Sequence, residues 1–251
     1  MPTKTTSADR TLSVFECFSE IGMPATLSEI ARHLAIPVSS CSGLLKTLEQ
    51  RGYLHTVESR SSYYPTNRLL QVARSIAEND PLISRVSPIL EKLRDETGET
   101  VILAKRCDTE VLFLDVVESR SNIRCVAQVG ERHPAYASSL GRALLGLMED
   151  EARARMFKRM QFRRITDKTL VSARAVEAAI AADRRRGFYC NYGESTADLH
   201  AMSLPLMVGG KEYAMGIAGP AKRFQEHRKR NMAALEKACK AVADPAPHAK
   251  G

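Results

Sequence analysis

The stretch from Thr26 to Leu54 carries the clearest hydrophobic pattern in the chain. Thr26 and Glu29 have the spacing of a capping box, so a helix should begin there. Ala35-Ile36-Pro37 then interrupts the pattern, and proline suits the first turn of a second helix. Two apolar sets follow the i, i+3, i+4, i+7 spacing of amphipathic helices: Leu27, Ile30, Ala31 and Leu34, then Cys41, Leu44, Leu45 and Leu48. The pattern predicts two short helices that pack face to face, as in a helix-turn-helix.

The outer face of the second predicted helix is small and polar. It holds Ser39, Ser40, Ser42, Gly43, Lys46 and Thr47. Hydroxyl and amide donors on such a face can reach phosphates and base edges in a major groove. A helical hairpin that serves only packing shows the same pattern, so the residues alone leave that alternative open.

A short β-hairpin should follow the two helices. Tyr53–Val57 and Tyr63–Pro65 are β-prone, and the residues between them form a turn. This hairpin has the size of a wing. Arg60, Ser61 and Ser62 at its tip could touch phosphates, although a solvated turn fits them equally well. With a helix at Ala8–Ile21, residues 8–66 form the predicted DNA-binding domain.

Residues 67–80 are predicted to form a linker helix. Thr66 can cap it, and its apolar stripe makes it a plausible dimer surface: Leu69, Val72, Ala73 and Ile76. Leu82–Thr97 is expected to be a further helix, ended by Gly98.

After Gly98 the chain alternates between strand-like and helix-like segments. The predicted strands are Thr100–Lys105, Val111–Val117, Arg124–Val129, Phe188–Tyr192, Leu199–Val208 and Tyr213–Ala218. The predicted helices are Leu140–Met148, Glu149–Met160, Ala173–Arg186 and Gln225–Ala243. Residues 81–243 are therefore predicted to be an α/β domain with a largely antiparallel sheet, and residues 244–251 a flexible tail.

Charge favours an anionic partner only weakly. The net charge is +8 and the isoelectric point is about 9.3. Residues 1–80 nevertheless hold eight basic and eight acidic side chains, so the excess lies entirely in the second part. The basic stretches Arg153–Arg164 and Lys222–Arg230 are expected to be solvated helix faces that could add weak, salt-dependent DNA contacts.

The remaining composition predicts a cytoplasmic protein without metal or cofactor. Six cysteines are scattered, and no histidine–cysteine cluster has the spacing of a zinc site. The N-terminus lacks the apolar core of a signal peptide, and no apolar run approaches the roughly 18 residues that span a bilayer. No membrane association is expected.

Five segments together resemble the IclR family of bacterial transcriptional regulators, over roughly residues 8–240. They read ADRTLSVFECF, TLSEIARHLAIPVSSCSGLLKTLEQRGYL, HPAYASSLGRALL, RRRGFYCNYGESTADLHAMSLPL and AMGIAGPAKRF. The resemblance implies an α+β chain, with an N-terminal, mainly helical winged helix-turn-helix and a C-terminal GAF-like effector domain. It also implies a homodimer or homotetramer on double-stranded operator DNA, acting as a repressor or activator under the control of a small organic or aromatic acid.

The predicted recognition helix departs from the family pattern P-K-S-T-x-x-R. Val38 and Gly43 stand at the lysine and arginine positions, which suggests a different operator or weaker direct readout. A glycine inside a helix costs about 1 kcal/mol relative to alanine, which close approach to the duplex or to the first helix would explain. The predicted DNA contacts are Thr26, Pro37, Ser39, Ser40, Ser42, Gly43, Lys46, Thr47, Arg60 and Ser61.

The predicted effector site begins where a loop enters a helix, at Ser138-Ser139-Leu140-Gly141. Free N–H groups and the helix dipole suit a carboxylate there, although an ordinary capped helix remains the alternative. The resemblance assigns ligand-binding amides to Ser139 and Leu140, and places the other pocket positions at Asn191, Ala201, Gly216 and Ala218. Strand alternation puts Ala201 and Ser203 on one face, and Ala214, Gly216 and Ala218 on one face of the partner strand.

These small residues would leave room for an acid with a bulky, less polar body, such as an aromatic or alicyclic carboxylate. Close packing is the alternative. The effector-site candidates are Ser138, Ser139, Leu140, Asn191, Ala201, Ser203, Gly216 and Ala218. Glu194 is expected to be structural, and His200 to face away from Ala201.

Two other functions compete with this interpretation. An enzyme could assemble a hydrolytic set from Ser138, Ser139, His133, His200 and Asp198, but the sequence lacks the motifs G-x-S-x-G, S-x-x-K and H-E-x-x-H. We therefore expect no catalysis. A DNA-binding protein without a ligand would keep the helix-turn-helix but show no ligand-dependent stability.

Overall fold

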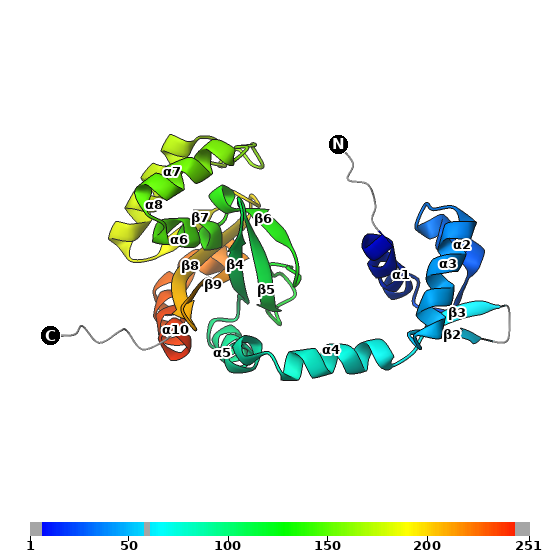
Figure 1. The fold of residues 1–251 in the computed structure, drawn as a ribbon. Helices are drawn as coiled ribbons and strands as arrows, with labels where there is room; N and C mark the ends of the chain where they lie inside the picture. The colour runs from blue at the N-terminus through cyan, green and yellow to red at the C-terminus, as the bar shows by residue number, and fades with distance from the viewer. Residues whose placement is uncertain (1–6, 58–60, 244–251) are drawn as a thin grey trace. The chain divides into compact units, whose positions relative to one another are not determined.

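The computed structural model describes residues 7–57 and 61–243 (Figure 1). The chain divides into two compact units between Asp80 and Pro81. Arg60 at the predicted wing tip and the predicted tail at 244–251 lie outside the described residues. The predicted α+β class is confirmed, because the first unit is mainly helical and the second contains an antiparallel sheet.

The first unit contains the predicted pair of helices. Its elements are α1 Ser7–Ile21, β1 Ala25–Thr26, α2 Leu27–His33, α3 Val38–Gln50, β2 Leu54–Val57, β3 Ser62–Pro65 and α4 Arg68–Glu78. The capping box before α2 is confirmed, since Glu29 N donates to Thr26 Oγ1 (3.3 Å) and Thr26 N donates to Glu29 Oε2 (2.8 Å). Helix α3 begins directly after Pro37, as the break in the pattern predicts.

The core of the first unit comes from the facing stripes of α2 and α3. Ile30 and Ala31 pack with Cys41, Leu45 and Leu48, and α1 adds Val14, Cys17 and Phe18. The sequence did not reveal strand β1, which pairs with β3 and makes the wing sheet three-stranded in the order β1-β3-β2. Two residues are too few to show an alternating pattern.

Helix α4 exposes its apolar stripe. Thr66 Oγ1 accepts the Arg68 N–H (3.2 Å), although Asn67 is the flanking residue of the helix. No residue of α4 is buried, and Ile76 is 67% exposed. Its role as a dimer surface stays a prediction.

The second unit is built on a six-stranded antiparallel sheet in the order β6-β5-β4-β9-β8-β7. Its strands are β4 Thr100–Cys107, β5 Glu110–Val117, β6 Arg132–Pro134, β7 Tyr189–Tyr192, β8 Leu199–Val208 and β9 Lys211–Pro220. The helices are α5 Pro81–Thr97, α6 Ser139–Leu147, α7 Asp150–Arg159, α8 Ala173–Arg186, α9 Ala221–Glu226 and α10 Arg228–Val242. A single 3₁₀ turn, Ala135–Ala137, precedes α6.

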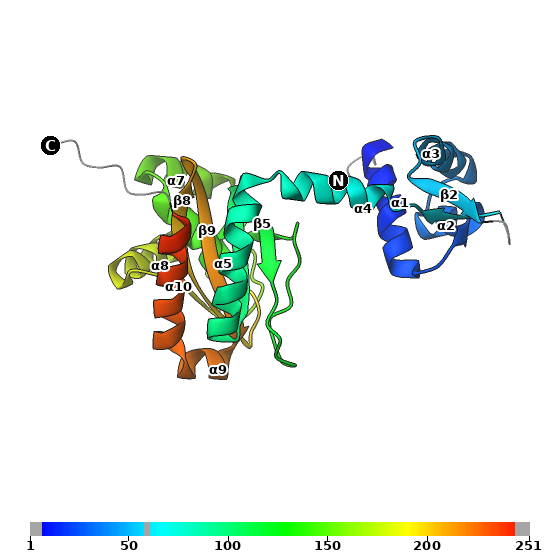
Figure 2. The same ribbon diagram turned by 90° about the horizontal axis from the view of Figure 1, so that it is seen from below.

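Each face of this sheet has its own core, because successive strand residues point to opposite faces. Val101 and Leu103 pack with α5 and α10, which Figure 2 shows side by side. Ile102 and Ala104 pack on the face covered by α6 and α8. The second face carries the pocket described below.

The prediction of a strand at Arg124–Val129 is wrong. The segment is irregular. The edge of β5 pairs instead with β6 over Glu110–Leu112, and at Phe113 with the loop before β6, where Phe113 N donates to Glu131 O (3.0 Å). Ala127 is buried, while Val126 and Val129 are more than 60% exposed. Ala127 and Val129 would share a face in a strand, so their burial does not follow strand alternation. A β-prone composition alone cannot show whether a backbone partner exists.

The prediction of one final helix at Gln225–Ala243 is also wrong in its bounds and continuity. It begins at Ala221 rather than Gln225 and divides into α9 and α10. At His227 the backbone leaves the helical region (φ −104°, ψ 12°), and the two helices meet at a corner in Figure 2. Phe224 is buried and anchors α9 against the sheet.

The two basic stretches are only partly solvated. Arg153 is 1% exposed, donates to Met148 O (2.7 Å) and pairs with Glu177 and Asp150. The hydrogen bond to Glu177 raises the pKa of Arg153 further. Arg223 pairs with the fully buried Glu99, so these arginines hold the fold together and are not free for DNA.

Candidate functional site

The outer face of α3 is exposed and almost uncharged. Val38, Ser39, Ser42, Gly43, Lys46 and Thr47 are exposed, and Ser40 is half-buried. Pro37 provides no side-chain cap, so the first N–H groups of α3 have no capping partner. An uncapped helix N-terminus flanked by serine hydroxyls suits a phosphate oxygen.

Two of the predicted DNA-contacting hydroxyls are already used within the chain. Thr26 Oγ1 donates to Glu29 Oε2 (2.8 Å), and Thr47 Oγ1 donates to Gly43 O (2.8 Å). Neither hydroxyl has a proton left for a phosphate, which a sequence pattern cannot show because the side-chain rotamer decides it. Ser61 directly precedes strand β3 of the wing and is exposed.

Gly43 is not needed for helix packing. A Cβ atom added at Gly43 would meet no atom within 4 Å, so close approach to α2 does not explain the glycine. The predicted close approach of Gly43 to a duplex stays a prediction.

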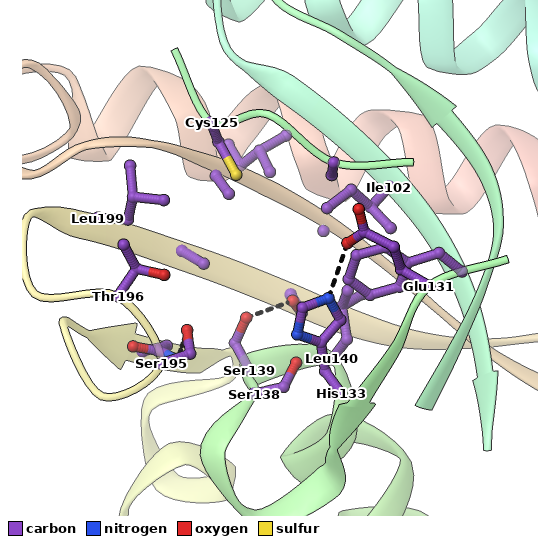
Figure 3. A pocket seen from close by; sticks show the side chains of 18 of the residues that line it. Ile102, Cys125, Glu131, His133, Ser138, Ser139, Leu140, Ser195, Thr196 and Leu199 are labelled. Atoms are coloured by element: carbon purple, nitrogen blue, oxygen red, sulfur yellow. Dashed lines mark hydrogen bonds and ion pairs between the residues drawn. The ribbon is translucent and has the colours of Figure 1, made fainter. Parts of the chain in front are cut away.

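A cavity of about 150 Å³ lies in the second unit, where β8, β9 and the start of α6 meet (Figure 3). Every predicted effector-site residue lines it: Ser138, Ser139, Leu140, Asn191, Ala201, Ser203, Gly216 and Ala218. The predicted strand faces are confirmed, because Ala201 pairs with Ala218 and Ser203 with Gly216 in the β8–β9 register.

Ser203 and Gly216 form a matched pair in the cavity wall. A Cβ atom at Gly216 would overlap Ser203 Oγ and crowd Leu140 Cδ2. Ser203 Oγ in turn lies 2.7 Å from Ser139 Oγ, and both serines are buried. The missing side chain on β9 therefore lets a hydroxyl on β8 reach the start of α6.

Asn191 supports the cavity wall rather than offering a free donor. Its Nδ2 donates to Ala137 O (2.6 Å) and to Ser195 Oγ (3.1 Å), and its Oδ1 accepts the Glu194 N–H (2.8 Å). Both amide hydrogens are used, so this side chain positions the loop that enters α6.

Helix α6 is anchored by a buried arginine. Arg142 is 1% exposed and donates to both carboxylate oxygens of Glu194, with Nη2 3.2 Å from Oε1. Its Nε lies 3.5 Å from Asp183 Oδ2, and burial raises the pKa of Asp183. The structural role expected of Glu194 is confirmed.

The cavity wall also holds residues that were not among the predicted effector contacts, and three of them have titratable side chains: Cys125, Glu131 and His133. His133 Nε2 lies 2.9 Å from Glu131 Oε2 (Figure 3). The ring of His133 stacks on Phe113 with centroids 4.7 Å apart. Cys125 and Glu131 lie in irregular backbone and His133 in a three-residue strand, so no periodic signal in the sequence identifies any of the three.

The possible hydrolytic set is not assembled. Ser139 bonds to Ser203, and His200 packs its ring against Tyr192 and Phe224. Burial, with a smaller contribution from Glu131, raises the pKa of Cys125 to about 11, so its thiol is neutral. The cavity therefore has no activated nucleophile among its described side chains.

Over residues 7–57 and 61–243, no group of three histidine, cysteine or acidic side chains is placed to hold a metal ion. No helix in this described part is long and apolar enough to cross a membrane.

The helix-turn-helix, its wing and the effector-type second unit define a DNA-binding transcriptional regulator. Sequence profiles described as "Bacterial transcriptional regulator IclR C-terminal" and "IclR helix-turn-helix domain" match residues 74–244 and 7–58. The chain belongs to the IclR family, whose members are transcriptional regulators rather than enzymes.

Relatives extend over most of the chain. The transcriptional repressor IclR of Escherichia coli (strain K12) is 28% identical over 226 residues, which cover 88% of this chain and 82% of that protein. The IclR structure from Thermotoga maritima shares the fold with a TM-score of 0.80, at 18% identity and 95% and 98% coverage of the two chains. An IclR homologue from Microbacterium hydrocarbonoxydans, solved in complex with 4-hydroxybenzoate, has a TM-score of 0.74 at 23% identity, covering 93% and 95%.

Proposed function

We propose that this protein binds operator DNA through α3 as a dimer or tetramer, and that a monocyclic carboxylic acid in the second-unit cavity controls that binding. The observation that carries the proposal is the cavity itself, which has the start of α6 at one side and small strand residues along its wall.

The start of α6 supplies the acid-binding end. Ser138 accepts the Gly141 N–H at 3.5 Å, the long limit of a hydrogen bond, and no other side chain caps the helix. The N–H groups of Ser139 and Leu140 therefore lack intrahelical partners and point out of the helix start. Together with the helix dipole they favour a carboxylate.

The size of the cavity favours one ring. An engineered cavity of about 150 Å³ in another protein holds benzene, and this cavity has a similar volume of about 150 Å³. Ile102, Phe113 and Leu199 provide apolar surface beside Ala201 and Ala218. The neighbour that was solved with 4-hydroxybenzoate supports an effector of this size.

The test is operator binding on DNA that flanks the gene of this protein, measured with benzoate, cyclohexanecarboxylate, pyruvate and acetate. We expect a ring acid to change the binding constant and to raise the unfolding temperature, and the two small acids to do neither. Ala201→Phe should fill the cavity and remove the response while operator binding persists. His200→Ala, on the opposite face of the same strand, is the matched control.

The DNA-binding part is tested separately with Lys46→Ala. Removing one phosphate contact should weaken binding to all sequences and reduce the slope of log K against log salt by about one. Lys240→Ala removes the charge of an exposed lysine in α10 and should leave the slope unchanged.

If none of the acids changed the binding of the protein to its operator, the result would favour a DNA-binding protein without a ligand.

A further inference from the structure

The acid-binding cavity contains a carboxylate in its own wall. Glu131 and His133 line the side across from Ser195, Thr196 and Leu199, with the start of α6 between the two sides (Figure 3). A fixed carboxylate repels an acid ligand, because like charges in one site are unfavourable. Its presence in this wall therefore calls for a role other than direct contact with the acid. The hydrogen-bond partners of Glu131 indicate what that role is.

Both oxygens of Glu131 have partners within the chain. Oε1 accepts the Gln128 N–H (3.0 Å), and Oε2 lies 2.9 Å from His133 Nε2. The imidazole is also held by its stacking on Phe113, at an interplanar angle of 23°. Glu131 and Phe113 therefore fix the orientation of His133.

This orientation determines which ring nitrogen is available. A carboxylate acceptor beside Nε2 favours the tautomer with the proton on Nε2, which leaves Nδ1 of a neutral ring as an acceptor. Over residues 7–57 and 61–243, no hydrogen bond to His133 Nδ1 is formed. In Figure 3 this second ring nitrogen lies on the side of the imidazole away from Glu131, so a neutral His133 has one oriented acceptor in the cavity wall.

We propose that His133 determines effector specificity by accepting a hydrogen bond from a second polar group on the ring acid, a hydroxyl, and that Glu131 is its positioning residue. The inference rests on the proposed effector site and narrows its ligand class to monocyclic carboxylic acids with a ring hydroxyl. An unsubstituted ring would cover Nδ1 without satisfying it, and sites built around a hydrogen bond discriminate against ligands that lack the partner group. A second carboxylate would face Glu131.

The experiment is calorimetric titration of the full chain with benzoate, the three hydroxybenzoate isomers and a benzene dicarboxylate. We expect one hydroxybenzoate isomer to bind about tenfold more tightly than benzoate, or about 1.4 kcal/mol. His133→Phe keeps a ring beside Phe113 and should abolish this ratio while benzoate affinity stays within about twofold. His133→Asn, whose amide lies near the position of Nδ1, should retain part of the ratio.

Glu131→Ala tests the positioning role. Freeing the imidazole should reduce the preference for the hydroxylated acid without weakening benzoate, a change that loss of stability alone would not produce. Thermal unfolding of each variant confirms that it is folded.

The outcomes separate this inference from the proposed function. An unchanged hydroxybenzoate-to-benzoate ratio in His133→Phe would overturn the inference and leave the effector site standing. Tightest binding of the dicarboxylate would also overturn it, because His133 would then act as a donor. If no acid binds the wild-type chain, the effector site and this inference both fall, while operator binding by α3 is unaffected.

Discussion

Helices α3 and α6 both begin at ends that suit an anion, yet the rest of the chain constrains them very differently. In α3 the outer face is exposed, no side chain caps the start, and Gly43 has open space around it. In α6 every residue from Ser139 to Gly146 is buried. The exposed helix can change its contact residues at little cost to folding, whereas the buried helix has to be held in place before it can hold a ligand.

The glycines of the two helices show the same difference. A Cβ atom at Gly141 would overlap the backbone of Ala135, and one at Gly146 would overlap the Tyr189 ring. Packing requires these two glycines. It does not require Gly43, and the predicted approach of this glycine to DNA stays a prediction.

The largest effect should come from breaking the ion pair that anchors α6. Glu194→Ala leaves the buried charge of Arg142 with Asp183, 3.5 Å away, as its remaining acidic partner and with a hydrogen bond to Tyr136 O. Loss of one partner of a buried pair costs about 3–5 kcal/mol of unfolding free energy, which urea denaturation will measure. Lys46→Ala on α3 is the exposed counterpart and should cost less than about 0.5 kcal/mol. Similar costs for the two variants would contradict the contrast between the helices.

Gly141→Ala should destabilise the second unit by about 2–3 kcal/mol, because the new methyl group meets backbone that cannot move independently. The start of α6 would shift, so the acid response should weaken along with stability. Thermal unfolding with and without benzoate gives both readouts. Full stability with full acid response would show that this close approach is unnecessary.

Gly43→Ala should have the opposite effect on stability. Alanine favours the helix by up to about 1 kcal/mol, and the added methyl group meets nothing. If the glycine admits the duplex, operator affinity should fall by about tenfold, a loss of about 1.4 kcal/mol, while the unfolding temperature rises. A more stable variant with unchanged operator affinity would rule out the DNA explanation.

The smallest effect concerns the rate of alkylation of Cys125. With a pKa of about 11, only about one thiol in a thousand is ionised at pH 8, so iodoacetamide should react slowly and about tenfold faster per pH unit up to that pKa. Benzoate in the cavity should slow the reaction at Cys125 and leave Cys107, which does not line the cavity, unaffected. Mass spectrometry distinguishes the two cysteines. If benzoate slowed the alkylation of Cys125 and Cys107 equally, the acid would have to bind outside this cavity.

Local patterns predicted most of the elements but not the contacts made by long side chains. Helical spacing located α2 and α3, and alternation located β8 with the bounds that the structure shows. The same reasoning treated Arg153 as solvated, because its acidic partner Glu177 is far away in the sequence. It also assigned a strand at Arg124–Val129, where β-prone residues form no backbone ladder.

The sequence by itself determined the two-part organisation, the helix-turn-helix and the β8–β9 hairpin, because capping, periodicity and the Gly209-Gly210 turn act between neighbouring residues. From that hairpin it could place Ala201 opposite Ala218. Only the tertiary structure decided that Asn191 and Arg142 position α6, and that Glu131 and His133 enter the cavity. Those relations depend on packing between distant segments, which no local pattern records.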